Sequence, residues 1–271
     1  MKLGVTLRNM GPQSSAAIMA GGAEAAEARG FESLWITDHI AIPPDDAEGS
    51  GGRYTDPLTT LAWLAGRTRA IGLGTGVLIL PYRSPLPTVK QVATVQELSG
   101  GRLLLGVGIG WMAAEFRALG VPLSERVRRS EEVLTLLADC FAGDVVSRHG
   151  QPFIFSPRPA PPPVYVGGRA PHALDRALRF GHGWLPMTRD PDALGADLAQ
   201  FAALAAELGR TSGPVTARAG LPLDDGPRAA ALLGRYRALG IERLVCTLRY
   251  RTLDDYQRQL DVLAALRDRE V

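Results

Sequence analysis

Short apolar runs alternate with longer amphipathic segments along the whole chain. The short runs are rich in Val, Ile and Leu, which is typical of strands, and the segments between them place apolar residues three and four positions apart, which predicts helices. We predict eight strands, at Leu3–Leu7, Ser33–Thr37, Gly72–Leu80, Leu103–Gly108, Val164–Val166, Trp184–Met187, Val215–Ala219 and Arg243–Thr247. The helices that we predict are Ala16–Arg29, Leu58–Thr68, Thr88–Ser99, Arg126–Phe141, His172–Phe180, Ala193–Leu208, Arg228–Leu239 and Leu253–Arg267.

Regular alternation of strands and helices is the pattern of βα units around a parallel sheet. Eight strands with eight helices match the count of a closed (β/α)8 TIM barrel, which we expect to fill residues 1–271 as a single α/β domain. Several predicted helices are followed by a glycine that suits a helix C-terminus, such as Gly30, Gly209 and Gly240. An open doubly wound sheet is the alternative, because the pattern does not show whether the first and last strands meet.

Two segments interrupt the alternation. Residues 110–163 form a long insertion between the fourth and fifth strands; it contains one predicted helix and then a proline-rich stretch. A loop of that length is either a functional lid or binding element, or a decoration of the rim. Residues 40–54 follow the second strand without periodicity, so a barrel would place them on its catalytic face.

Composition and charge exclude several classes of function. The 30 Lys and Arg residues nearly balance the 28 Asp and Glu residues, so we expect neither nucleic acid nor a membrane surface as a partner. The start of the chain runs directly into the first predicted strand, and no apolar stretch is long enough to span a membrane. Cys140 and Cys246 are far apart and form no C-x-x-C motif, so we expect a cytoplasmic protein without a disulfide framework.

Polar residues at the carboxyl ends of the strands are the candidates for chemistry, since a (β/α)8 barrel builds its active site there. Asp38 and His39 directly follow the second strand, which would bring a carboxylate and a ring that titrates near neutral pH to the mouth of the barrel. A polar start to the following loop is the alternative interpretation.

Glycines are concentrated in the third and fourth strands, where they would normally weaken a sheet. Gly74 and Gly76 lie in one strand, and Gly106 and Gly108 lie in the next. Neighbouring strands that lack side chains near their ends leave a flat slot of the kind that a planar ring needs. A dinucleotide-binding motif is disfavoured because neither run has the G-x-G-x-x-G spacing between a strand and a helix.

A further pair of glycines, Gly167 and Gly168, ends the fifth strand and is followed by Arg169 just before a helix. Backbone N–H groups near a helix N-terminus suit a phosphate, and the arginine would add positive charge; a tight strand-to-helix turn is the alternative. No His or carboxylate pair has the spacing of metal ligands, so we expect no metal. The chain also lacks a G-x-S-x-G elbow and a Walker lysine.

Taken together, these motifs have an order and spacing that resemble those of a known family. The matching pieces are Trp35-x-x-Asp38-His39, Asp56-Pro57-Leu58, Gly74-Thr75-Gly76-Val77 with Pro81-Tyr82-Arg83, Leu98-Ser99-Gly100-Gly101-Arg102, Gly106-Val-Gly-Ile-Gly-Trp111 with Glu115-Phe116, and Pro162-Pro-Val-Tyr-Val-Gly-Gly168. Nearly the whole chain resembles the luciferase-like monooxygenase superfamily, and within it the oxidoreductases that depend on the deazaflavin coenzyme F-420 (F420).

This resemblance implies a (β/α)8 barrel that holds a deazaflavin or a flavin in its mouth and commonly forms a homodimer. It implies that Asp38 and His39 lie beside the ring as the catalytic pair, with His39 donating a proton or orienting the substrate. It also implies a non-proline cis peptide at Gly76-Val77, which would back the ring. The remaining cofactor-binding residues implied are Thr75, Gly106 and Gly108 around the ring, and Gly167, Gly168 and Arg169 at the phosphate.

One departure affects the expected chemistry. Some sugar-phosphate dehydrogenases of the family use a Glu soon after the glycines of the fourth strand and a Trp in the loop after the second. Here those positions correspond to Trp111 and to Ile42 or Pro43, so we do not expect that acid–base scheme to transfer.

The function we predict is hydride transfer between C5 of F420 and a small organic substrate. A monooxygenase that uses reduced FMN is the first alternative, and a barrel that binds a flavin without turnover is the second. A lyase or aldolase barrel fits poorly, because Lys90 lies in a helix rather than at a strand end. An apolar lining for the substrate is expected from Leu78, Ile79, Trp111, Phe116 and Met187, although each of these also suits the core.

Overall fold

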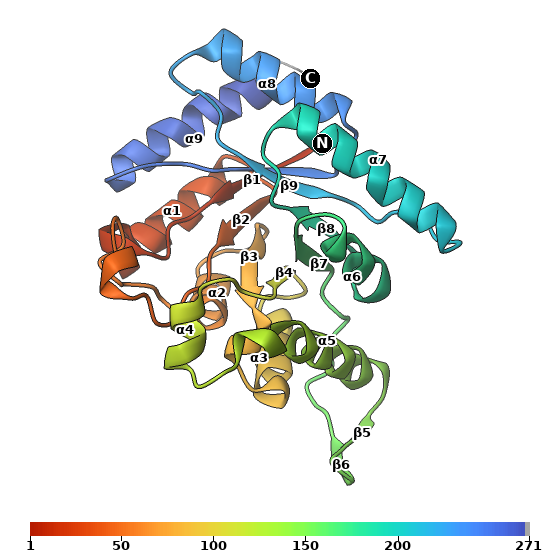
Figure 1. The fold of residues 1–271 in the computed structure, drawn as a ribbon. Helices are drawn as coiled ribbons and strands as arrows, with labels where there is room; N and C mark the ends of the chain where they lie inside the picture. Colours follow the sequence, from red (N-terminus) through yellow and green to blue (C-terminus); the bar gives the residue numbers. More distant parts are fainter. Residues whose placement is uncertain (269–271) are drawn as a thin grey trace.

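In the computed structural model, which describes residues 1–268, eight parallel strands form one sheet around the centre of the molecule (Figure 1). The order of the strands round the sheet is β8-β7-β4-β3-β2-β1-β10-β9. Their bounds are β1 Lys2–Thr6, β2 Ser33–Ile36, β3 Gly72–Ile79, β4 Leu103–Gly108, β7 Val164–Gly168, β8 Gly183–Pro186, β9 Thr216–Ala219 and β10 Arg243–Cys246. Every predicted strand is confirmed, with its ends shifted by at most two residues.

The sheet closes into a barrel between its two outer strands, β8 and β9. Trp184 and Val215 form a parallel bridge there, and the Trp184 N–H donates to the Pro214 carbonyl at 3.0 Å. The first strand pairs with the last, from Lys2 with Arg243 to Val5 with Cys246. The structure is therefore the expected (β/α)8 barrel rather than an open doubly wound sheet.

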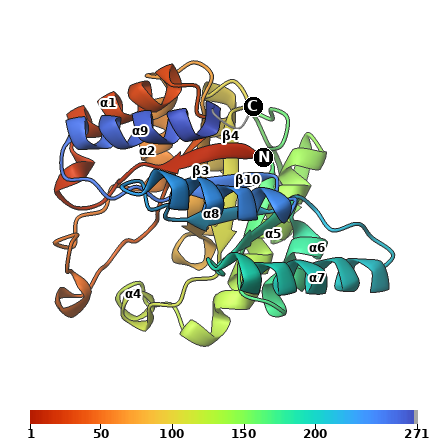
Figure 2. The same cartoon turned by 90° about the horizontal axis from the view of Figure 1, so that it is seen from above.

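Helices surround the barrel and connect successive strands (Figures 1 and 2). Capping side chains set where several of them begin: Ser15, Asp56, Asp190 and Asp225 each accept a hydrogen bond from a backbone N–H in the first turn. The helices are α1 Ala16–Ala28, α2 Pro57–Ala65, α3 Pro85–Leu98, α4 Ala113–Ala118, α5 Arg126–Ala142, α6 His172–Phe180, α7 Pro191–Glu207, α8 Gly226–Ala238 and α9 Leu253–Asp268. All eight predicted helices are present, and α4 was not predicted.

The insertion between β4 and β7 contains more regular structure than its sequence suggested. It holds α4, a short 3-10 turn, α5 and a two-stranded antiparallel hairpin, β5 Val145–Arg148 and β6 Gln151–Ile154, which projects from the body of the protein (Figure 1). His149 and Gly150 form the two-residue turn of the hairpin with φ angles of 50° and 78°. Positive φ at both positions is the requirement of the turn that connects such strands, and a histidine gave little signal for it.

Two layers of side chains fill the interior of the barrel below its carboxyl end. Arg243 lies in the layer nearer the amino ends of the strands, and its guanidinium donates hydrogen bonds to Glu32, Tyr165 and Thr216. Trp35, Tyr165, Leu185 and Val245 pack above it, with Val77 against them. The interior of the barrel is therefore a packed core.

The helices of residues 1–268 include none that is long and apolar enough to cross a membrane.

Candidate active site

A pocket of about 730 Å³ opens at the carboxyl ends of the strands. Pockets of this size are typical of small-molecule and cofactor sites. Its walls come from six strand ends and from the insertion, and they comprise Thr37, Asp38, His39, Gly76, Val77, Ile79, Gly108, Ile109, Gly110, Trp111, Leu123, Arg126, Gly167, Gly168, Arg169, Leu185, Met187 and Arg218. All the site residues predicted from sequence line this pocket except Thr75 and Gly106.

Thr75 and Gly106 lie just below the pocket and join β3 to β4. The Thr75 hydroxyl donates to the Gly106 carbonyl at 2.7 Å, and a Cβ on Gly106 would lie 2.0 Å from the Thr75 carbonyl oxygen. The two strands approach each other so closely here that no side chain fits at Gly106. These two residues thus shape the floor from beneath.

The wall formed by β3 and β4 contains a cis peptide between Gly76 and Val77, as the resemblance implied. The register between the two strands shifts at the same place, between Thr75 and Leu78. The side chain of Val77 occupies the space left by two glycines: a Cβ on Gly108 would lie 2.5 Å from it, and a Cβ on Gly167 would lie 2.7 Å from it. The glycines therefore let Val77 form a smooth wall.

On the opposite side of Val77, the end of β7 passes into α6. Gly168 has a φ of 142°, a conformation that strongly favours glycine, and a Cβ there would lie 2.9 Å from Ala173 in α6. Gly167, Gly168 and Arg169 all line the pocket immediately before the N-terminus of the helix. The expected phosphate-binding elements are therefore in one place, with their backbone facing the cavity.

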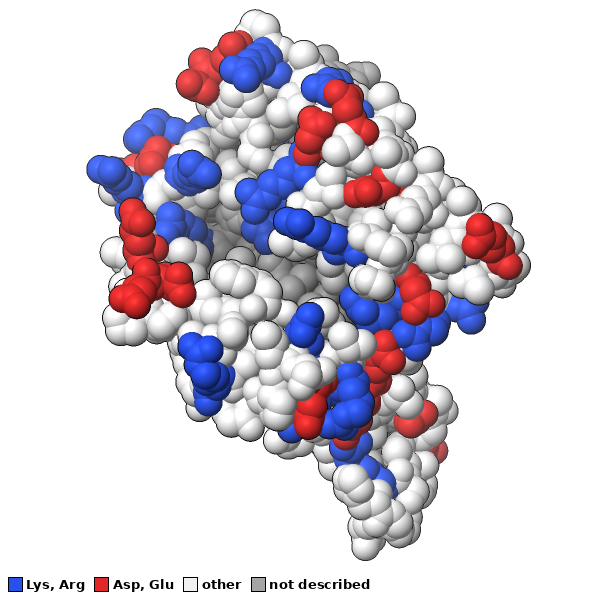
Figure 3. Space-filling model, viewed as in Figure 1, with Lys and Arg blue, Asp and Glu red and all other residues white. Residues whose placement is uncertain are grey.

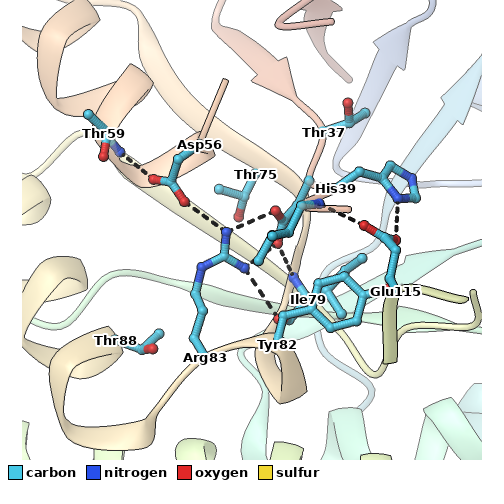
Figure 4. A network of polar contacts seen from close by, with 12 residues as sticks. Thr37, His39, Asp56, Thr59, Thr75, Ile79, Tyr82, Arg83, Thr88 and Glu115 are labelled. Carbon is cyan, nitrogen blue, oxygen red and sulfur yellow. Dashed lines mark hydrogen bonds and ion pairs between the residues drawn. The ribbon is translucent and has the colours of Figure 1, made fainter. Parts of the chain in front are cut away.

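His39 is held by a carboxylate that the sequence analysis did not assign to the site. Its Nδ1 lies 2.7 Å from Oε2 of Glu115, which comes from α4 and is fully buried (Figure 4). The second oxygen of Glu115, Oε1, accepts from the backbone N–H groups of Ile40 at 2.6 Å and Ala41 at 2.9 Å. Glu115 therefore binds the start of the loop after β2 as well as the ring of His39.

Tyr82 completes this cluster by donating its hydroxyl to Oε2 of Glu115 at 2.8 Å. Burial alone would raise the pKa of Glu115, but the bonds from the Ala41 N–H, His39, the Ile40 N–H and Tyr82 hold it below its usual range. Burial and the neighbouring carboxylate raise the pKa of Tyr82. Glu115 is thus an ionised acceptor, so Nδ1 of His39 carries the proton, and Nε2 has no protein partner within residues 1–268.

Asp38 has a different role from the one its position next to His39 suggested. Its two oxygens bind the two terminal nitrogens of Arg83 at 2.5 Å and 2.9 Å, and one of them also accepts from the Ile79 N–H at 2.8 Å. Arg83 binds Asp56 at 2.8 Å as well (Figure 4). Burial acts to lower the pKa of Arg83, but the paired carboxylates of Asp38 and Asp56 raise it.

Both oxygens of Asp38 are therefore occupied in a buried ion pair, which ties the end of β2 to the end of β3. Asp38 lines the pocket, but both of its oxygens already accept hydrogen bonds from Arg83. We assign it to positioning the loop that carries His39 rather than to catalysis.

Of the site residues that sequence reasoning missed, Arg218 lay in no quoted motif, whereas three others had been quoted without a role. Tyr82 and Arg83 belong to one motif and Glu115 to another. The departure at Trp111 had suggested only that the acid–base scheme of the sugar-phosphate dehydrogenases does not transfer; the structure brings Glu115 of α4 to His39 from another position. The sequence signal that could have identified Glu115 was a carboxylate in a short apolar helical segment soon after the glycines of β4.

Arginines give the pocket a positive lining. Arg126, Arg169 and Arg218 line it, whereas its single acidic lining residue, Asp38, is already paired. Lys and Arg side chains also gather around the hollow seen in Figure 3. The pocket therefore suits an anionic ligand. Within residues 1–268 no group of three or more His, Cys, Asp or Glu side chains is arranged to hold a metal ion.

The substrate-side residues expected from sequence divide into two groups. Ile79, Trp111 and Met187 line the pocket, and the last two are 70% and 52% exposed. Leu78 and Phe116 are buried in the core instead. The apolar lining thus includes a buried wall residue, Ile79, and two exposed residues, Trp111 and Met187.

Comparison with known protein families gives a match over nearly the whole chain. The family model described as luciferase-like monooxygenase matches residues 3–267. An F420-dependent hydroxymycolic acid dehydrogenase of Mycobacterium tuberculosis is 32% identical over 234 residues, which are 82% of this chain and 64% of that protein. A 5,10-methylenetetrahydromethanopterin reductase of Methanolobus tindarius is 30% identical over 193 residues, 69% of this chain and 55% of that one.

Solved structures show the same fold. The monooxygenase RslO1 from Streptomyces bottropensis superposes with a TM-score of 0.82 at 19% identity, over 100% of this chain and 99% of that chain. An F420-dependent secondary alcohol dehydrogenase, in complex with an F420-acetone adduct, gives a TM-score of 0.80 at 14% identity, over 98% and 97% of the two chains. At these identities the likeness concerns the fold alone.

Proposed function

Since this chain belongs to the luciferase-like monooxygenase family, we propose that it is an oxidoreductase that transfers a hydride between F420 and a small organic substrate. The observation that carries this proposal is the pairing of His39 with the ionised Glu115 on the wall of a positively lined, glycine-walled pocket. The choice of F420 is supported by the F420-dependent dehydrogenase that is 32% identical over most of this chain.

The residues of the pocket fit a tricyclic ring with a phosphate-bearing side chain. Gly76, Val77 and Gly108 form a flat wall for the ring, and Gly167 with Arg169 would hold the phosphate. Arg218 lines the same pocket, and its buried Nε has no hydrogen-bond partner among residues 1–268. When bound, the deazaflavin supplies a carbon that accepts or donates a hydride.

His39 is the residue placed to move the proton that accompanies this hydride. Because Glu115 accepts from Nδ1, the neutral ring presents an unprotonated Nε2. Nε2 can therefore take a proton from a substrate hydroxyl or return one to a carbonyl. Glu115 and Tyr82 fix the orientation of the ring without contacting the substrate.

The rim of the pocket indicates the chemical character of the substrate. Trp111 and Met187 expose apolar surface beside the cavity, which favours a substrate with an apolar body. The polar part of such a substrate would then face His39 and the arginines below.

An equilibrium titration of the purified protein, stripped of cofactor, tests the choice of cofactor. We would titrate it with F420 and with FMN, each in oxidised and reduced form, and follow fluorescence. Micromolar or tighter binding of F420 without comparable binding of FMN is the expected result. Preference for reduced FMN would replace hydride transfer with the chemistry of an oxygen-using monooxygenase.

A substitution of His39 tests whether the barrel is catalytic. We expect His39→Ala to lower turnover by about 10²- to 10⁴-fold, the usual contribution of general acid–base catalysis, while cofactor affinity changes little. His149→Ala, in the exposed turn of the hairpin, is the matched control and should change neither quantity. Unchanged turnover in His39→Ala would contradict the assignment of the proton-transfer residue.

A further inference from the structure

Arg218 crosses the interior of the barrel. It lies on β9, and three strands separate β9 from β3 in either direction round the sheet, so the two strands face each other. The guanidinium nevertheless reaches β3, where Nη1 donates to the Gly76 carbonyl at 2.7 Å. Arg218 also lines the pocket. Its charged group therefore forms part of the pocket floor, directly beside the wall assigned to the ring.

A second interior arginine shows what a satisfied guanidinium looks like in this barrel. Arg243 on the adjacent strand β10 is 1% exposed and binds both oxygens of Glu32, at 2.6 and 2.7 Å. It also donates to Tyr165 at 3.1 Å and to Thr216 at 3.0 Å. The lower end of the barrel thus supplies an anion and two hydroxyl groups for its buried cation.

Arg218 has no such complement in the part of the chain that the structure describes. No carboxylate pairs with it, its buried Nε has no acceptor, and the backbone carbonyl of Gly76 is its one protein acceptor. Burial, with Arg189 nearby, lowers the pKa of Arg218. Because a guanidinium keeps its proton in proteins, the charge remains and is uncompensated. The side chain is half-buried at the floor of the pocket, and a partly buried charge without a counter-ion is costly unless another group compensates it.

We propose that Arg218 binds an oxyanion of the bound small molecule at the floor of the pocket. This inference rests on the proposed function in that the ligand occupies the same pocket. Two sources present the required chemistry: the carboxylate of a substrate, or the ionised N–C=O edge of the cofactor ring. Both offer two acceptor atoms in a plane.

The geometry of the side chain favours this ligand over a simple inorganic anion. A guanidinium presents its N–H groups as a planar fork, which matches two acceptors side by side. With Nη1 tied to the Gly76 carbonyl, the fork is held in one orientation and loses little freedom when a ligand binds. The apolar rim formed by Trp111 and Met187 would cover the rest of such a ligand.

The first arm of the test measures carboxylate binding. Benzoate is titrated into the cofactor-free protein, followed by its thermal shift, and into the cofactor-loaded protein, followed by cofactor fluorescence. The variants are Arg218→Met and Arg228→Met, the latter removing an arginine from a neighbouring groove outside the pocket. If the source is a substrate carboxylate, Arg218→Met weakens benzoate binding at least tenfold and Arg228→Met does not.

The second arm measures ionisation of the bound ring. The absorbance of the bound cofactor is followed against pH in the wild type and both variants, with Arg218→Lys included to keep the charge without the fork. If Arg218 meets the ring, Arg218→Met raises the pKa of the bound ring by at least one unit, which is a tenfold change in its ionisation equilibrium. Arg218→Lys gives a smaller rise and Arg228→Met none.

The proposal is overturned if Arg218→Met leaves both benzoate affinity and ring ionisation within twofold of the wild type. In that case Arg218 only ties β9 to β3, and the substitution lowers the thermal midpoint instead. Failure of the proposed function is a separate result: the wild type then binds neither F420 nor FMN. The benzoate arm on the cofactor-free protein still decides the role of Arg218.

Discussion

Replacing Glu115 by Gln is the sharpest test of how the site is organised, because it removes one charge and keeps the shape. The carboxylate accepts four hydrogen bonds, two on each oxygen. An amide has one acceptor oxygen and one donor nitrogen. The backbone N–H groups of Ile40 and Ala41 cannot become acceptors, so the amide oxygen must face them. The amide nitrogen then faces His39 and Tyr82.

This arrangement reverses the tautomer of His39. To receive the amide N–H, Nδ1 must give up its proton, and the neutral ring then carries its proton on Nε2. The nitrogen assigned to the substrate thus changes from acceptor to donor. Turnover should fall by about 10²- to 10⁴-fold, the full range expected for loss of a general acid–base group.

The effect on stability is smaller. A hydrogen bond to a charged group contributes about 1 kcal/mol more than one between neutral groups, so four weakened bonds give an upper value of about 4 kcal/mol. The lower cost of burying an amide than a carboxylate opposes this loss. We therefore expect the free energy of unfolding to decrease by about 2 kcal/mol in Glu115→Gln. Glu97→Gln, on the exposed face of α3, is the matched control.

The pH dependence of stability gives an independent readout. The pKa of Glu115 is lower in the folded protein than in the unfolded chain, so its stabilising contribution is complete above the unfolded value of about 4.5 and is lost as the pH falls through the folded value. The difference in unfolding free energy between wild type and Glu115→Gln should therefore shrink as the pH falls from 6 to about 3, measured by denaturant unfolding. A constant difference, or wild-type turnover in the variant, would refute the reasoning.

Three further substitutions probe the walls of the site. Arg83→Met leaves the buried carboxylate of Asp38 without its partner and should cost about 3–5 kcal/mol in denaturant unfolding. Gly108→Ala places a Cβ 2.5 Å from Val77, so the wall must move, and cofactor affinity in the fluorescence titration should fall at least tenfold. Gly234→Ala, in the interior of α8 with no atom within 4 Å of the new Cβ, should stabilise the protein by about 0.5–1 kcal/mol and leave cofactor affinity unchanged.

The barrel itself was predictable because its information is local. Each strand and helix is marked by its own periodicity, and the glycines after the helices mark where they end. The hairpin β5–β6 was missed because its turn uses His149 in a conformation usually taken by Gly, Asn or Asp. The slot between β3 and β4 was predictable for the same local reason, since glycines within a strand indicate that a ligand or another backbone segment approaches the strand closely.

The side chains that organise the site were not predictable in this way, because their partners are distant in sequence. Glu115 lies 76 positions from His39, and Arg218 lies 142 positions from Gly76. Spacing carries no signal for such contacts. Asp38 illustrates the opposite error: adjacency to His39 suggested a catalytic pair, but its carboxylate turns away to Arg83. Strand direction places residues at the mouth without determining which way each side chain turns.

The two interior arginines show how the fold separates stability from function. Arg243 lies at the amino end of the barrel, where Glu32, Tyr165 and Thr216 satisfy it completely. Arg218 lies one layer nearer the carboxyl end and has no counter-ion in the described chain. If Arg218 served the same structural purpose, selection for stability would favour a carboxylate beside it or an apolar replacement. Its unpaired charge is therefore best explained by a ligand, at the end of the barrel where the pocket opens.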